Sequence, residues 1–265
     1  MNVFWREMKA NRKSLLIWAV ALLFMVVAGM AKFAGYSSSG QSINELISQM
    51  PKSLQAMMGT GDLDLSTAAG FYGMLFSYLL LMAAIHALML GAGIIAKEER
   101  DKTAEFLMAK PISRSRIVTA KLLAAVVNVV FFNLITLVLS LAMVNHYSQA
   151  GESLADIYLL LGGMLLFQLI FLSLGAAIAA AGRRPKRANG LGTGILLIMY
   201  IVSIAIDLKN QLEPLQYFTP FKFFEAKRVL SDGNLDPVFC AISMVLILLF
   251  VIITYNSFKK RDLQV

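Results

Sequence analysis

The sequence predicts an all-α membrane protein with six transmembrane helices. Of the 265 residues, 58% are hydrophobic and 15% are charged, whereas about a quarter of the residues are charged in ordinary soluble proteins. The apolar residues gather in six runs, and a helix needs about 20 such residues to cross a bilayer. The predicted spans are 14–33, 69–96, 117–144, 157–182, 190–208 and 238–255. The whole chain, 1–265, is therefore predicted to form a single transmembrane domain.

The basic residues predict how the chain is oriented. The formal net charge is +8, but the Lys and Arg residues lie in short clusters between apolar runs, which is typical of membrane proteins and not of nucleic-acid binding. Six spans place both termini on one side, and eighteen of the 24 basic residues then lie on that side. This asymmetry predicts a multi-pass protein of the cell membrane with both termini in the cytoplasm.

The first 14 residues have helical periodicity. Apolar Phe4, Trp5 and Met8 share one face, and basic residues supply the other. We expect residues 1–14 to form an interfacial helix in the headgroup layer. The alternative is that they are only the positively charged flank of the first span.

Two connections on the predicted outer side are also expected to contain helices. The first carries apolar residues at helical spacing, which predicts one amphipathic helix: Ile43, Leu46, Ile47, Met50, Leu54 and Met57. In the second, Thr219 is a candidate N-cap, Pro220 suits the first helical position and Gly233 follows the predicted end. Both elements are candidates to gate an exit or to seal a dimer.

The chain lacks the residue patterns of an enzyme. It contains no G-x-x-x-x-G-K-[ST] motif for a nucleotide and no H-E-x-x-H motif for zinc. The two histidines, His86 and His146, lie in different predicted spans, and Cys240 is the single cysteine. We therefore expect no catalytic residue, no metal site and no cofactor on this chain.

Polar residues inside the predicted spans are few. They are His86, Asn128, Asn133 and Gln168. Such groups either bond across helices as packing contacts or line a translocation path. Small residues at four-residue spacing, such as Gly175 and Ala179, predict close helix packing. No Asp, Glu, Lys or Arg is placed securely at a span centre, which suggests that the energy source lies outside this chain.

The segment between the second and third spans is the most distinctive part of the sequence. Charged residues at 97–102 end the second span, and residues 103–110 form about two helical turns that end before Pro111. Ser113 can cap the third span. A short helix that carries Phe106 and Leu107 between charged flanks fits a groove on another protein. The alternative is an ordinary charged loop at the membrane surface.

This segment resembles the permease signature of ABC-2 type transporters. The resemblance rests on Gly91, Glu98, Glu99, Thr103, Glu105, Pro111, Ile112, Ser113, Arg114 and Lys121. The family usually has Gly before that Thr, where this chain has Lys102. The closing FKKRDL, the span count and the outer helix before the last span also match, so the resemblance covers nearly the whole chain.

The resemblance implies a half-size membrane subunit of a bacterial ABC exporter. Two permease chains, as a homodimer or with a sibling chain, would pair above two separate ATP-binding subunits that hold the ATP and magnesium. The loop at 98–116 would be the coupling helix. The implied ATPase-coupling residues are Glu98, Glu99, Thr103, Glu105, Phe106, Leu107, Pro111 and Arg114. The basic cluster at 183–187 would contact membrane lipid or, secondarily, the ATPase.

The cargo that we expect is amphipathic or hydrophobic, most naturally a peptide, including toxic or antimicrobial peptides. The reason is an interior rich in Phe and Met that lacks charged binding groups. Two alternatives stay open. One is a membrane sensor or assembly partner of an ATPase that transports nothing, and the other is an ion-coupled or drug efflux permease.

Overall fold

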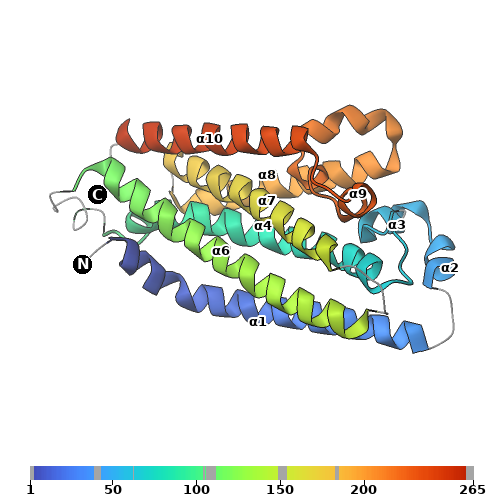
Figure 1. Ribbon diagram of the computed structural model, residues 1–265. Helices are drawn as coiled ribbons and strands as arrows, with labels where there is room; N and C mark the ends of the chain where they lie inside the picture. The colour runs from blue at the N-terminus through green and yellow to red at the C-terminus, as the bar shows by residue number, and fades with distance from the viewer. Residues whose placement is uncertain are drawn as a thin grey trace.

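The described part of the chain is a bundle of long helices, without a strand. The computed structural model describes residues 3–38, 43–61, 63–103, 105, 112–148, 154–182 and 185–260. Six helices are long and apolar enough to cross a membrane (Figure 1). They are α1 (Val3–Ser38), α4 (Ala68–Arg100), α6 (Arg114–Tyr147), α7 (Ala155–Ala181), α8 (Pro185–Leu208) and α10 (Pro237–Lys260). The prediction of an all-α membrane protein with six spanning helices is confirmed.

The bundle has two unlike ends. We call one the terminal end, because α1 begins and α10 ends there, on the left in Figure 1. Helix α4 also ends there and α6 begins there, so the loop between them belongs to this end. The opposite end carries the short helices α2 (Ile43–Ser48), α3 (Lys52–Met58) and α9 (Ala226–Asp232), with the 3-10 helices η1 (Asn210–Phe218) and η2 (Pro220–Lys222).

Helix α4 lies at the centre of the bundle, and its largest interface is with α7. The two backbones meet at a pair of glycines. A Cβ atom added to Gly91 would lie 2.1 Å from the carbonyl oxygen of Leu172, and one added to Gly175 would lie 2.3 Å from that of Leu88. Side chains are excluded at both positions, so these glycines permit the close α4–α7 contact. This is the tight packing that the small residues predicted.

Buried polar side chains join the helices within the bundle. Asn133 on α6 donates to the Leu161 carbonyl oxygen and to Gln168 Oε1 on α7, both at 3.2 Å. The Tyr72 hydroxyl on α4 donates to Ser140 Oγ on α6 at 2.7 Å. Inside a membrane such bonds replace the water that a polar group would otherwise have. Asn133 and Gln168 therefore contribute to packing between helices.

Helix α1 differs from the sequence-based expectation. The residues predicted to form an interfacial helix and the first span form one uninterrupted helix of 36 residues. Neither Gly nor Pro occurs between Val3 and Ala28, so nothing in the sequence breaks the helix there. The first turns also pack against the bundle, because Val3 and Glu7 are buried.

The connections at the opposite end also differ in detail. The single amphipathic helix expected after the first span is two short helices, α2 and α3, separated at Pro51. Proline lacks the N–H that a continuous helix would need there. In the second connection, Pro220 begins η2 and Gly233 caps α9 with a φ of 63°, as its sequence suggested. The element expected between them is divided into η2 and α9, and the Thr219 side chain makes no cap hydrogen bond. The 3-10 helix η1 was not expected.

Candidate functional site

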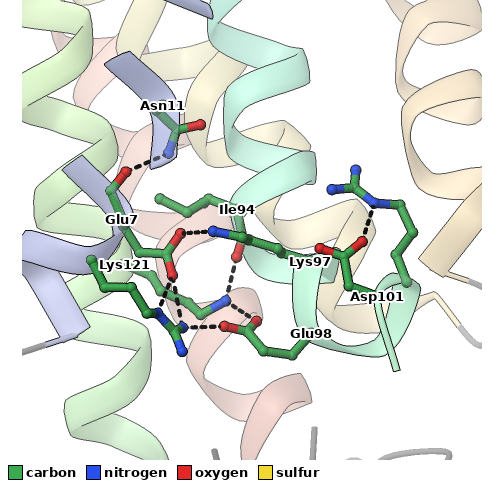
Figure 2. A network of polar contacts seen from close by, with 9 residues as sticks. Glu7, Asn11, Ile94, Lys97, Glu98, Asp101 and Lys121 are labelled. Carbon is green, nitrogen blue, oxygen red and sulfur yellow. Dashed lines mark hydrogen bonds and ion pairs between the residues drawn. The ribbon is translucent and has the colours of Figure 1, made fainter. Parts of the chain in front are cut away.

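The end of the bundle beneath the 98–116 loop holds a network of five charged side chains. They come from three helices: Arg6 and Glu7 from α1, Lys97 and Glu98 from α4, and Lys121 from α6. Figure 2 shows Glu7, Lys97, Glu98 and Lys121 pointing toward one another between these helices. The network joins the two helices that flank the loop to the N-terminal helix.

Lys121 is the most deeply placed member of the network. Its side chain is 0% exposed, and its ammonium donates to the Glu98 carboxylate and to the Ile94 carbonyl oxygen. Glu98 also pairs with Arg6. An ammonium in such a place needs both a countercharge and hydrogen-bond acceptors, since the burial of an unpaired charge is very unfavourable. Helix α4 supplies both to the lysine of α6.

Glu7 ties α1 to the same cluster. Its side chain is 0% exposed and is bound by Arg6 Nη2 at 2.8 Å and by Lys97 Nζ at 3.0 Å. Its backbone carbonyl oxygen accepts a hydrogen bond from Asn11 Nδ2 at 3.0 Å. Because each carboxylate of the network binds two cations from different positions, α1, α4 and α6 are held in one relative arrangement.

A specific turn ends α4 directly above the network. The Thr103 N–H donates to the Glu98 carbonyl oxygen at 2.7 Å, and the Lys102 N–H donates to that of Glu99 at 3.4 Å. This is the Schellman pattern of helix ends, in which the residue after the C-cap adopts a left-handed conformation. That residue is Lys102, with a φ of 55°. Glu98 thus closes the helix with its backbone while its side chain holds Arg6 and Lys121.

The position of Lys102 explains a departure noted in the sequence. Left-handed backbone strongly favours glycine, because a Cβ atom there is crowded by the backbone. The signature that this segment resembles usually has glycine at this position, and the turn observed here gives a physical reason for that preference. The chain keeps the same turn with a lysine.

The predicted coupling residues fall into three groups. Glu98 is only 6% exposed and is engaged within the chain, so its carboxylate does not lie on the surface. Thr103 and Glu105 are exposed, and Glu99 is half-buried. Phe106, Leu107 and Pro111 lie outside the described residues.

The start of α6 is fastened to the rest of the bundle. Ser113 is its N-cap, and the Ser113 side chain accepts a hydrogen bond from the Arg116 N–H, as predicted. Arg114 Nη1 donates to the carbonyl oxygen of Lys259 near the end of α10, at 3.0 Å. Donors from Arg commonly satisfy the last carbonyl groups of a helix. Arg114 therefore links the start of α6, where the loop ends, to the last helix, α10.

The polar residues predicted along the spans are not gathered at this network. Asn133 and Gln168 lie together between α6 and α7. Asn128 Nδ2 donates to the Ala124 carbonyl oxygen of its own helix. His86 is 3% exposed and stacks on Phe132, with 4.5 Å between the ring centroids. All four are buried, and they lie in three separate places.

Sequence reasoning missed most of the network. Glu7 stood out as an acidic residue among basic ones, and Lys121 as a cation followed by an apolar run. Ionisable residues in or beside membrane spans usually pair with one another. The presence of these isolated opposite charges was therefore the one signal in the sequence that they form a pair. The pairs that join α1 to α4 connect residues 90 and 92 positions apart, and these pairs could not be read from spacing.

The described residues contain no group of His, Cys, Asp or Glu side chains that could hold a metal ion. A family model described as "ABC-2 family transporter protein" matches residues 1–263. A comparison with curated proteins gives no match.

Proposed function

The chain belongs to the ABC-2 transporter family and is a permease subunit of an ABC transporter; from that premise we propose that it is driven by separate ATP-binding subunits through its 98–116 loop. We place this loop and both termini in the cytoplasm, because eighteen of the 24 Lys and Arg residues lie on that side of a six-span topology.

One observation carries the proposal: a buried ionic network, which we call the base of the loop, joins the two helices between which the loop lies. Glu98, near the end of α4, and Lys121, near the start of α6, form a buried ion pair. Arg6 on α1 also binds Glu98. Buried ionic groups fix a relative arrangement because leaving one charge unpaired is unfavourable. A displacement of the loop by an ATPase would therefore move α1, α4 and α6 together. Glu98 serves in this base, whereas exposed Thr103 and Glu105 remain free to face the partner.

We further propose that the transporter exports amphipathic or hydrophobic cargo, including peptides. Two permease chains, identical or sibling, would pair with two ATP-binding subunits that hold ATP and magnesium. The support is the high content of Phe and Met and the absence of a nucleotide motif in this sequence. We also propose that the basic residues at 183–187 contact anionic lipid.

The coupling role is tested by a double substitution in the loop. Changing Phe106 and Leu107 to Asp should abolish the stimulation of the partner ATPase while the permease still inserts. The matched control changes Leu215 and Phe218 to Asp, because these residues of the same types are exposed on η1 at the opposite end. ATPase activity is measured with the purified complex in lipid vesicles. Unaltered stimulation in the loop variant would remove the docking role.

Transport is tested separately from coupling. Vesicles that contain the permease and its ATP-binding subunit should accumulate a labelled amphipathic peptide when ATP is supplied, also after ion gradients are dissipated. Coupled ATPase activity with no accumulation of any peptide would favour the sensor alternative. Accumulation that stops when ion gradients collapse, with ATP intact, would favour an ion-coupled transporter.

A further inference from the structure

A cavity of about 280 Å³ opens beside the ionic network and runs along α4 between α1 and α8. Its lining extends from Arg100, at the terminal end, to His86. These residues are 14 positions apart on one helix, which is about 21 Å at 1.5 Å per residue. The cavity thus reaches from the end of the bundle into the middle of the membrane-spanning region.

The inner end of this cavity holds an unsatisfied polar group. His86 is 3% exposed, and its Nδ1 has no hydrogen-bond partner in the described part of the protein. Its ring stacks on Phe132 and meets the edge of Trp18, which also lines the cavity. A buried nitrogen without a partner is unfavourable by roughly 1–3 kcal/mol. The imidazole makes the inner end of the cavity polar.

A glycine also lies in the cavity wall. Glycine in a helix interior is unfavourable by roughly 0.5–1 kcal/mol relative to alanine, so it usually has a reason. Gly91 has one, because a Cβ atom there would meet the backbone of α7. Gly93 has no such packing reason: an added Cβ would meet nothing within 4 Å. Its effect is to leave the cavity open.

The remaining lining residues define the chemistry of the occupant. Both charged residues in the described lining, Lys97 and Arg100, are cations near the mouth, and no carboxylate belongs to it. Lys97 is paired with Glu7, whereas within the described residues Arg100 pairs with exposed Asp101, and a pair exposed to solvent is weak. Neutral hydrogen-bonding side chains follow further in, from Asn11, Ser14 and Asn189.

We propose that this cavity binds an amphipathic molecule whose anionic group lies at the mouth, beside Lys97 and Arg100. The apolar body extends along α4, and a polar group at its inner end lies against the imidazole of His86. The inference rests on the proposed function, since it makes the cavity the site where anionic amphipathic cargo is taken up from the cytoplasmic side.

The test measures binding without ATP and without a partner subunit. The chain contains two tryptophans, Trp5 and Trp18, so a Trp5→Phe variant leaves Trp18 as the single donor at the cavity. The probe is a dansyl-labelled alkyl sulfonate, whose dansyl group accepts energy from tryptophan and whose sulfonamide can bond to an imidazole. We expect saturable transfer in lipid nanodiscs. The trimethylammonium analogue should bind about tenfold more weakly, which corresponds to one charge-assisted contact.

Two substitutions localise the binding. Gly93→Leu should fill the cavity and abolish saturable transfer. Its matched control is Gly162→Leu on α7, because an added Cβ at exposed Gly162 also meets nothing within 4 Å. His86→Phe keeps an aromatic ring beside Phe132 but removes Nδ1, and should weaken binding about tenfold.

Three results would overturn the proposal: equal transfer in the Gly93→Leu and Gly162→Leu variants, equal binding of the anionic and cationic probes, or unchanged binding in His86→Phe. Because the assay contains no ATPase, its failure leaves the coupling role of the 98–116 loop intact. Loss of coupling would likewise leave this binding result standing.

Discussion

Neutralising Glu98 should destabilise the bundle far more than neutralising an exposed charge nearby. The substitution Glu98→Gln leaves the fully buried ammonium of Lys121 with the Ile94 carbonyl oxygen but without its carboxylate. Breaking a buried ion pair by removing one partner typically lowers the free energy of unfolding by about 3–5 kcal/mol. We expect a loss in this range.

The geometry also predicts an order among variants. Lys121→Met should lower the free energy of unfolding less than Glu98→Gln, because Glu98 then keeps Arg6, whose side chain is 30% exposed. The matched control is Arg100→Gln at the same helix end. Its pair with Asp101 is 46% exposed on both sides, and exposed pairs contribute about 1 kcal/mol or less.

A double variant separates the pair from its surroundings. Replacing both partners by apolar residues, Glu98→Leu with Lys121→Met, removes the buried charges together. Such replacements are often neutral or stabilising, so the double variant should be more stable than Glu98→Gln. The free energy of unfolding is measured by SDS titration in mixed micelles, followed by circular dichroism.

The ion-pair reasoning would be refuted by either of two results. One is a Glu98→Gln variant within about 1 kcal/mol of the natural protein, the range of an exposed pair. The other is a double variant whose loss equals the sum of the losses in the single variants Glu98→Leu and Lys121→Met, since the effects of residues in one network should not be additive.

Three further outcomes follow from single positions. Lys102→Gly should raise the free energy of unfolding by about 1 kcal/mol, because glycine adopts the left-handed φ of 55° without strain; thermal unfolding measures it. Gly91→Leu should lower it by about 3 kcal/mol or more, since a Cβ would lie 2.1 Å from a backbone oxygen of α7, and the same SDS titration shows this. Hydrogen bonds from Ser66 and Asn44 lower the pKa of Asp64, so its stabilisation is complete above the ordinary pKa and is lost as the pH falls through the lowered one. Asp64→Asn, which keeps an acceptor oxygen, should remove that acid-side loss in thermal unfolding between about pH 2 and pH 6.

The spans were predictable because membrane burial leaves a signal in local composition. All six apolar runs correspond to observed helices. Each helix covers its run to within one residue, and most continue beyond the run. The extensions have a simple cause. The thickness of the hydrocarbon layer sets the length of the apolar run, but it does not end the backbone hydrogen bonding of the helix. A helix therefore continues past the run until a capping residue or a helix-breaking residue ends it. Ser113 is such a cap, and it was recognised from sequence.

Other features depended on contacts that spacing does not encode. The first turns of α1 looked like a surface helix, but Glu7 is buried because Lys97 and Arg6 complete its surroundings. That arrangement brings together residues 90 positions apart. The break at Pro51, by contrast, was present in the sequence, and the apolar periodicity through it concealed it. The inward orientation of Glu98 likewise depends on its partners in other helices, Arg6 and Lys121.

The network and the cavity share helix α4, and this predicts which wall of the cavity can move. Its α1 wall is tied to α4 by Glu7 and Lys97, whereas Asn189 on α8 belongs to the opposite wall and to no such network. We expect a push on the loop to change the cavity by moving α8 relative to the α1–α4–α6 unit.

A crosslink between the two walls tests this consequence. In a complex of the ATP-binding subunit with a Trp5→Phe, Cys240→Ala variant, we expect nucleotide to change the energy transfer from Trp18 to the dansyl probe. Joining Ser14→Cys to Asn189→Cys by a bis-maleimide should abolish that change. A crosslink inside the unit, between Met8→Cys and Asn128→Cys, should preserve that change, because the two side chains already touch at 3.5 Å. If the first crosslink is tolerated and the second is not, the moving boundary lies between α1 and α6, and the ionic network cannot be the rigid base of the loop.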